Sequence, residues 1–269
     1  MLFFFKILSK LSLRKLYLFS DLINIFFLII IPYRKKITLN NLKNVFNSKT
    51  KKEIKIIYKQ YYKYLTDIIL ETIKLLDLNE KSVKKRIKLL NPEIINKLDK
   101  NRPTIILSAH YGNWEWLFAS LCVNFKGNTY AIYKPLSNQF FNNLILKIRC
   151  KFGGKLITKN KSGKFILKNF KKKSILFVLA DQVPETLNNT ISIKFLNRNT
   201  TFSKGLEKLC INSNAIVLYA KMEKKKRGCY TVEFSKIEKN IIREYARKTE
   251  VSIFEKPENW LWSHNRWKR

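Results

Sequence analysis

The stretch TIILSAHYGNWEWLFASLCV (residues 104–123) changes character twice along its length. TIILSA (104–109) is a short apolar run typical of a buried strand, HYGN (110–113) has the composition of a turn, and WEWLFASLCV (114–123) is predicted to be a helix. A buried strand followed by a turn and a helix is a building unit of an α/β sheet. Side chains at such turns face the crevice beyond the carboxyl ends of the strands, where α/β proteins bind ligands.

The rest of the chain repeats this alternation. Apolar runs bounded by turn residues predict further strands at 129–133, 174–180, 215–220 and 230–234. Helices are predicted at 114–124, 138–151, 162–171 and 203–212. Upstream, Thr50 and Glu53 have the spacing of a capping box, and they open an amphipathic helix of about 25 residues. We therefore expect an α/β fold with a mixed, mostly parallel sheet flanked by helices.

The N-terminus contains an apolar stretch from 16 to 31 that includes Asp21 and Asn24. It is shorter than the roughly 20 apolar residues that a bilayer-spanning helix needs. Basic residues flank both of its ends, so they predict no orientation. We expect a helix that anchors the chain in the membrane interface, and a buried core helix is the alternative. This divides the chain into a membrane-anchor segment (1–36) and a second domain (37–269).

The composition limits the classes of function. The 269 residues carry 54 Lys and Arg against 19 Asp and Glu, a formal charge of +35. Such a charge attracts anionic partners, namely nucleic acid, acidic lipid headgroups or an acidic carrier protein. The sequence contains no nucleic-acid recognition motif, and its apolar N-terminus does not suit that class. The four cysteines are widely spread, which argues against a disulfide framework or a zinc site and for a reducing compartment.

His110, one of only two histidines, begins the predicted turn, and Glu115 lies in the first turn of the helix that follows. A carboxylate on one imidazole nitrogen fixes the tautomer and leaves the other nitrogen free as a general base. Backbone N–H groups of the turn could then stabilise an oxyanion during acyl transfer to a hydroxyl. The spacing alone also fits a structural histidine. A metal site is disfavoured because only His264 could supply a second imidazole.

Several motifs resemble those of the lipid A biosynthesis (lauroyl/myristoyl-type) late acyltransferases, within the H-x4-D/E glycerolipid acyltransferase superfamily. SAHYGNWEW (108–116) resembles the H-x-G-N-W-E form of that box, and VLADQVPE (178–185) resembles the D-Q box. The segments 33–46, 131–157 and 257–268 resemble the family's basic stretch, its Arg-before-Phe-Gly block and its Trp-rich terminus.

The resemblance implies an enzyme at the cytoplasmic face of a Gram-negative inner membrane, with no cofactor. It would transfer a fatty acyl group from acyl carrier protein to a hydroxyl of a 3-hydroxyacyl chain on a lipid A precursor of the Kdo-lipid A type. By position, His110 is the general base and Glu115 its partner. Arg149 would contact an anionic group or position the acceptor, and Asp181 would hold a basic residue or orient the site. The resemblance thus implies that Arg149, Asp181, Asn113 and Gln182 bind the substrate.

Two departures affect the identity of the substrate. Leu196 and Asn197 stand where the family usually shows Phe and Gly, and the D-Q box is followed by VPE instead of a turn that contains Gly. An acyltransferase for another membrane glycolipid or an aminolipid is therefore the alternative. A catalytically inert membrane-surface protein with the same fold would require His110 to be dispensable.

Overall fold

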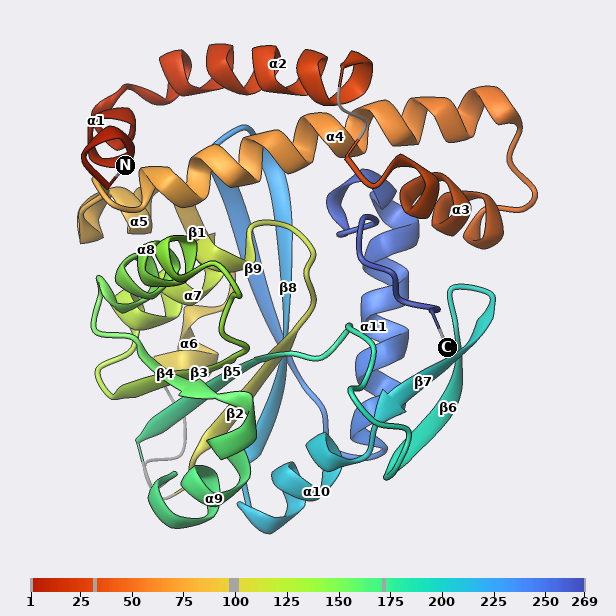
Figure 1. Ribbon diagram of the computed structural model, residues 1–269. Coiled ribbons are helices and arrows are strands. Elements are labelled where there is room, and N and C mark those ends of the chain that lie inside the picture. Colours follow the sequence, from red (N-terminus) through yellow and green to blue (C-terminus); the bar gives the residue numbers. More distant parts are fainter. Residues whose placement is uncertain (1, 31–32, 97–101, 171–172, 269) are drawn as a thin grey trace.

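The computed structural model describes residues 2–30, 33–96, 102–170 and 173–268. Within these ranges the strands are β1 (Ile87–Leu89), β2 (Thr104–Ser108), β3 (Asn128–Tyr133), β4 (Lys155–Thr158), β5 (Ser174–Leu179), β6 (Thr190–Phe195), β7 (Arg198–Ser203), β8 (Ile216–Lys226) and β9 (Cys229–Lys236). Seven of them form the central sheet in the order β1-β9-β8-β2-β5-β3-β4, and β6 pairs with β7 in a separate hairpin (Figure 1). In the central sheet β8 and β9 are antiparallel and the other neighbouring pairs are parallel. The prediction of a mixed, mostly parallel sheet is confirmed.

The described helices are α1 (Leu2–Lys10), α2 (Leu13–Ile29), α3 (Lys35–Val45), α4 (Lys51–Lys74), α5 (Glu80–Arg86), α6 (Pro92–Asn96), α7 (Trp114–Asn124), α8 (Gln139–Cys150), α9 (Lys159–Asn169), α10 (Gly205–Asn212) and α11 (Ile241–Glu255), and Pro257–Asn259 form a 3-10 turn, η1. The strands predicted from sequence are β2, β3, β5, β8 and β9, and the helices predicted between them are α7 to α10. The predicted end of α9 at residue 171 lies outside the described residues. The strands β1, β4, β6 and β7 and the helix α11 were not predicted.

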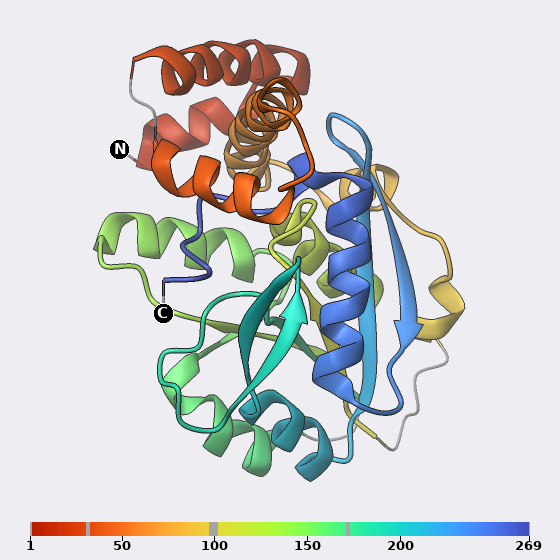
Figure 2. The same cartoon turned by 90° about the vertical axis from the view of Figure 1, so that its right-hand side faces the viewer.

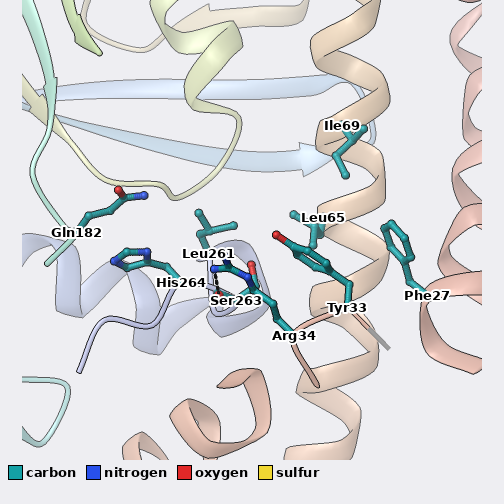
Figure 3. Close-up of a pocket in the computed structure, with 9 residues that line it drawn as sticks. All are labelled: Phe27, Tyr33, Arg34, Leu65, Ile69, Gln182, Leu261, Ser263 and His264. Carbon is teal, nitrogen blue, oxygen red and sulfur yellow. Dashed lines mark hydrogen bonds between the residues drawn. The ribbon is translucent and has the colours of Figure 1, made fainter. Parts of the chain in front are cut away.

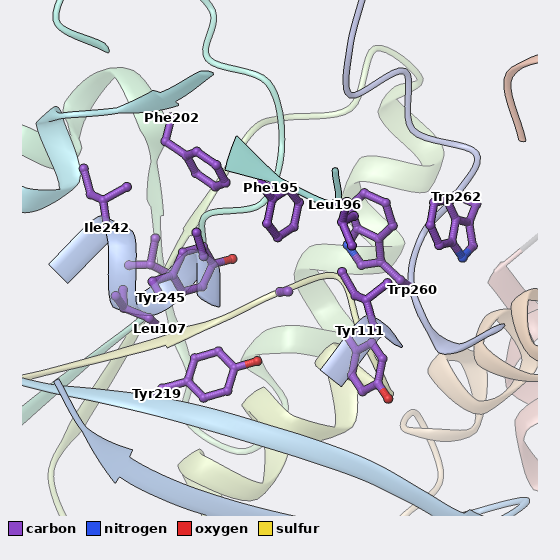
Figure 4. Close-up of a cluster of buried hydrophobic side chains, with 14 of the residues drawn as sticks. Leu107, Tyr111, Phe195, Leu196, Phe202, Tyr219, Ile242, Tyr245, Trp260 and Trp262 are labelled. Carbon is purple, nitrogen blue, oxygen red and sulfur yellow. The ribbon is translucent and has the colours of Figure 1, made fainter. Parts of the chain in front are cut away.

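The central strand β2 contributes to a core on each face of the sheet, because successive side chains of a strand point to opposite faces. Ile105 and Leu107 join one apolar cluster and Ile106 joins the other. The Ile106 face is covered by α5, α7 and α8, whereas α9, α10, α11 and the β6–β7 hairpin cover the other (Figures 1 and 2). Figure 4 shows the cluster that contains Leu107. There, aromatic rings from the hairpin, α11 and the C-terminal segment pack against side chains of β2 and β8.

Helix α4 lies across the carboxyl-terminal side of the sheet and carries the N-terminal helices (Figure 1). Its capping box is formed as predicted: the Thr50 hydroxyl accepts from the backbone N–H of Glu53, and the Glu53 carboxylate accepts from the backbone N–H of Thr50. Because α4 packs against α1, α2, α3 and η1, it is buried along most of its length.

Helix α2 packs on α4 with one face only. Leu16 is fully buried, and the Ser20 hydroxyl lies 2.7 Å from Oδ1 of Asp67 and 3.0 Å from Oγ1 of Thr66. The opposite face exposes large apolar side chains, namely Leu18, Phe19, Leu22, Ile25, Phe26 and Ile29. In the described part of the chain, no helix combines the length and apolar character needed to cross a membrane. Ile31, the last residue of the predicted apolar stretch, lies outside that part. The division at residue 36 stays a prediction, and Lys36 lies in the first turn of α3.

Candidate active site

The turn between β2 and α7 carries His110 and depends on a glycine. Gly112 has a φ of +63°, and a Cβ atom at this position would lie 2.9 Å from the carbonyl oxygen of Met222 on the neighbouring strand β8. Both the left-handed conformation and the close approach of two backbones favour glycine. Asn113 then caps α7, because its side-chain oxygen accepts from the N–H of Trp116.

Residues 259–261 near the C-terminus pair with this turn through backbone hydrogen bonds, as a neighbouring strand would. The N–H of Gly112 donates to the carbonyl of Asn259 at 3.0 Å, and the N–H of Leu261 donates to the carbonyl of His110 at 3.0 Å. The Tyr64 hydroxyl of α4 donates to the carbonyl of Gly112 at 2.6 Å. Backbone groups of the turn are therefore fixed by residues far away in the sequence. Because the Gly112 N–H is already engaged, it is unavailable to an oxyanion, which corrects part of the expectation for the turn.

Asp181, which follows β5, makes the carboxylate contact to the imidazole of His110. Its Oδ1 lies 2.7 Å from Nδ1 of His110, and its Oδ2 accepts from the backbone N–H of His110 at 3.0 Å and from Nε1 of Trp260 at 2.8 Å. Burial raises the pKa of the Asp181 carboxyl, but the His110 ring and these donors outweigh burial and hold the pKa below its ordinary value. An ionised Asp181 keeps the proton on Nδ1, so Nε2 carries the free lone pair.

Glu115, which we expected on the His110 ring, instead forms a bidentate ion pair with Arg149 of α8. Nε and Nη2 of Arg149 lie 2.8 and 2.6 Å from the two carboxylate oxygens. The pairing of Glu115 with the imidazole is therefore wrong as a contact. The physical reason is the sheet order: β5 lies beside β2, so Asp181 emerges next to His110, whereas the first turn of α7 faces α8.

Glu115 remains close to His110 through Trp114. The indole Nε1 of Trp114 donates to Glu115 at 3.1 Å, and its ring meets the His110 imidazole edge to face at 5.1 Å between centroids. Burial raises the pKa of the Glu115 carboxyl, but Arg149 outweighs this effect and the pKa lies below its ordinary value. The anionic group that Arg149 was expected to contact is thus supplied by the protein itself.

Asn113 does not line the site. Its side chain is 0% exposed, its oxygen caps α7, and its amide Nδ2 donates to a carboxylate oxygen of Glu71 at 2.7 Å. The structure therefore gives Asn113 a role within the fold, and its assignment to substrate binding stays a prediction. The residue types of the motif gave no sign of this, because the partner Glu71 lies on α4.

Gln182 is exposed beside Nε2 of His110, and its amide Nε2 donates to that nitrogen at 3.2 Å. Gln182 also lines a pocket of about 390 Å³ (Figure 3). The other lining residues come from α2, α4 and the segments around residues 33 and 262: Phe27, Tyr33, Arg34, Leu65, Ile69, Leu261, Ser263 and His264. Figure 3 shows Phe27, Leu65 and Ile69 toward one end of this pocket and Gln182 and His264 at the other. At that end Gln182 contacts the His110 ring.

His264 and Arg34 are pocket residues that were not assigned to the site from sequence. Burial lowers the pKa of His264 to about 4, so its ring is neutral at physiological pH, and Nε2 of His264 accepts from the N–H of Val183 at 3.4 Å. The Arg34 guanidinium donates to the carbonyl of Ser263 at 3.1 Å. Both lie in stretches whose resemblance to the family was noted, and only the fold shows that they share a pocket. Among the described residues, no group of three or more His, Cys, Asp or Glu side chains could hold a metal ion.

The family model for bacterial lipid A biosynthesis acyltransferases matches residues 1–269, the whole chain. The chain belongs to this family. It is therefore an acyltransferase of lipid A biosynthesis, and the family implies a lipid A precursor as the acceptor. A search of curated proteins found no match for the chain.

Proposed function

We propose that this acyltransferase moves a fatty acyl group from acyl carrier protein to a hydroxyl of a 3-hydroxyacyl chain on a lipid A precursor, with His110 as the general base. The observation that carries the proposal is the His110–Asp181 contact at 2.7 Å, with Gln182 and the pocket on the opposite, Nε2 side of the ring. This is the arrangement that a general base for a substrate hydroxyl requires.

The reaction then follows from the protonation states. The acceptor hydroxyl replaces the amide of Gln182 at Nε2 of His110, which the exposure of Gln182 permits. Nε2 takes the hydroxyl proton as the oxygen attacks the thioester carbonyl of the donor. When the tetrahedral intermediate collapses, the imidazolium returns the proton to the departing thiolate of the carrier. Asp181 stabilises the imidazolium throughout, because its carboxylate stays on Nδ1.

In this proposal the ion pair of Glu115 and Arg149 has a supporting role. It fixes the first turn of α7 against α8, and through Trp114 it packs the edge of the imidazole. We assign Glu115 to the active site as a positioning residue and not as the direct partner of His110.

The surface of the protein supports action at the cytoplasmic face of the inner membrane. The exposed apolar face of α2 would lie among the lipids. Phe27 of the same helix lines the pocket that Gln182 also lines. A lipid acceptor could thus reach the pocket from the membrane. The charge of +35 would favour the anionic membrane surface, the phosphorylated acceptor and the acidic carrier protein alike.

The test is a transfer assay with purified enzyme, acyl carrier protein donors and a lipid A precursor. We expect His110→Ala to remove transfer, and Asp181→Asn to lower kcat by about 10²-fold to 10⁴-fold because the ring loses the correct tautomer. Glu115→Gln should retain more of the activity than Asp181→Asn in the folded fraction. Glu244→Gln, which changes an exposed carboxylate on α11 in the same way, is the matched control.

Undiminished transfer by His110→Ala would refute the base assignment, and a larger loss in Glu115→Gln than in Asp181→Asn would return Glu115 to the role of partner. The acceptor is tested separately by mass spectrometry of lipid A from cells that lack the gene. We expect lipid A to lack the mass of one fatty acyl unit, and unchanged lipid A would point to another acceptor.

A further inference from the structure

A third carboxylate, Glu71 of α4, lies under the catalytic turn without touching His110. Its side chain is 0% exposed. Burial raises the pKa of its carboxyl above the ordinary value, although the hydrogen bonds that it accepts act to lower the pKa. An ionisable group is costly to bury unless its hydrogen bonds are satisfied. The contacts of Glu71 should therefore show what the carboxylate does in the fold.

The Glu71 carboxylate accepts four hydrogen bonds from different parts of the molecule. Oε1 accepts from the Tyr17 hydroxyl at 2.7 Å and from the N–H of Gly228 at 3.0 Å. Oε2 accepts from Nδ2 of Asn113 at 2.7 Å and from the Tyr230 hydroxyl at 2.6 Å. The two oxygens of a carboxylate offer about four acceptor sites, so an ionised Glu71 satisfies all four donors at once.

Two bonds from this residue hold the start of α7. Asn113 stands between His110 and the helix, and the Glu71 carboxylate orients the amide whose other atom caps α7. The backbone carbonyl of Glu71 also accepts from the indole Nε1 of Trp116 at 2.7 Å. Glu71 thus fixes both the cap and the first turn of α7, three residues beyond His110.

The opposite side of Glu71 is tied to α2. Tyr17 belongs to the helix whose outer face is apolar and exposed, and α2 runs along α4 in Figure 1. A Cβ atom on Gly228 would lie 2.6 Å from the Tyr17 hydroxyl, so the β8–β9 turn also fits closely against this helix. A continuous set of short bonds therefore joins α2, Glu71, Asn113 and the turn that carries His110.

We propose that Glu71 is a positioning residue for the His110 turn, and that through Tyr17 it makes the position of this turn depend on the seating of α2. The proposal rests on the proposed function for its kinetic consequence, because it assumes that His110 is the base. Its structural consequence, a change at the His110 ring when Glu71 is altered, can be measured without any reaction.

The first measurement uses the imidazole NMR signals, which are easy to resolve because the chain has only two histidines. Glu71→Gln places an amide NH2 group opposite at least one group that can only donate a hydrogen bond. The change should therefore shift the His110 signals, while those of His264 move less. Asn113→Ser keeps a side chain that can cap α7 but removes the donor to Glu71, and it should shift the same signals. Tyr17→Phe should cause a smaller shift in the same direction.

The second measurement is kinetic. A small displacement of a catalytic group costs rate more than binding, so we expect Glu71→Gln and Asn113→Ser to lower kcat by about 10-fold to 100-fold while KM changes by less than about twofold. Tyr17→Phe should show a smaller loss with the same split. Tyr130→Phe, which removes the hydroxyl of a buried tyrosine on β3, is the matched control and should behave as the wild type.

The proposal is overturned if folded Asn113→Ser and Glu71→Gln enzymes keep the wild-type His110 signals and kcat. It is also overturned if their loss of activity equals the unfolded fraction measured by near-ultraviolet circular dichroism. If Glu71→Gln does not fold, Asn113→Ser and Tyr17→Phe decide the outcome. If the wild type transfers no acyl group, the proposed function fails, and the NMR comparison still tests the hold of Glu71 on the turn.

Discussion

At the scale of single residues, two carboxylates and two basic groups near the turn pair in a definite way. The Asp181 carboxylate contacts the imidazole of His110, and the Glu115 carboxylate forms an ion pair with the guanidinium of Arg149. The planar guanidinium matches a carboxylate with two parallel bonds, whereas the imidazole offers a single N–H to Asp181. This division leaves Nε2 of His110 as the nitrogen directed toward Gln182 and the pocket.

The Glu115–Arg149 pair should make the stability of the protein depend on pH. Because the pKa of Glu115 in the folded chain lies below its ordinary value of 4.5, the carboxylate stabilises the fold above that value. This contribution is lost as the pH falls through the lowered pKa. Glu115→Gln should reduce the free energy of unfolding at pH 7 by about 3 kcal/mol, because it leaves the charge of Arg149 largely buried without its partner. The difference from the wild type should shrink below pH about 4.

Urea unfolding of both proteins across this pH range measures the effect. Glu244→Gln is the control, because it breaks the exposed pair with Arg247 on α11, where such pairs contribute about 0 to 1 kcal/mol. A loss for Glu115→Gln that is no larger than for Glu244→Gln, or that does not change with pH, would contradict the prediction.

At the scale of elements, the site is a strand–turn–helix unit completed by a distant segment. The β2–α7 turn supplies His110, β5 supplies Asp181, and the segment after η1 pairs with the turn and adds Trp260. In this arrangement the backbone of the turn lies directly against β8 at Gly112.

Gly112→Ala tests this arrangement. An alanine at φ +63° with its Cβ 2.9 Å from the Met222 carbonyl is strained, and we expect a loss of about 1 to 3 kcal/mol in the free energy of unfolding. The kcat should fall as well, because the turn that carries His110 must shift. The control is Gly163→Ala in α9, where an added Cβ meets nothing within 4 Å, and where alanine should be neutral or stabilising by up to about 1 kcal/mol. Equal effects of the two changes on stability and kcat would show that the turn is not strained.

At the scale of the whole molecule, the pocket reaches α2, whose outer face is apolar and exposed. Leu65 and Ile69 of α4 and Phe27 of α2 line the pocket, while the neighbouring side chains of α2 are exposed. Isolated apolar residues on a surface need no explanation, but a contiguous set on one helix face indicates an interaction surface. Because the chain carries a formal charge of +35, the partner that we propose is an anionic lipid membrane.

Leu22→Glu should therefore weaken the binding of the enzyme to vesicles that contain anionic lipids by about 10-fold, because a leucine that enters the interface contributes on the order of 1.5 to 3 kcal/mol. Leu22 is 63% exposed, so the fold should tolerate the change. Ile211→Glu on α10 changes the net charge equally at a side chain that is 67% exposed, and its vesicle binding should stay near the wild type. Vesicle flotation measures both. Equal losses would mean that net charge alone determines membrane binding.

The strands not predicted from the sequence were missed for two different physical reasons. The β6–β7 hairpin turns at Leu196 and Asn197, both at positive φ, and leucine in this conformation is not a recognisable turn signal. The strands β1 and β4 are very short edge strands with little apolar pattern of their own. They exist because a neighbouring strand offers backbone groups to pair with.

The sequence by itself determined the α/β class, the central strands, the capping box of α4 and the place of His110 at a strand end. Each of these depends on local patterns of apolar and turn-forming residues that span only a few positions of the chain. Only the tertiary structure decided that Asp181 and not Glu115 meets the imidazole, that Asn113 is buried on Glu71, and that Arg34 and His264 share a pocket. These pairings follow from the order of the strands and the packing of helices across the sheet, which join residues that are far apart along the chain.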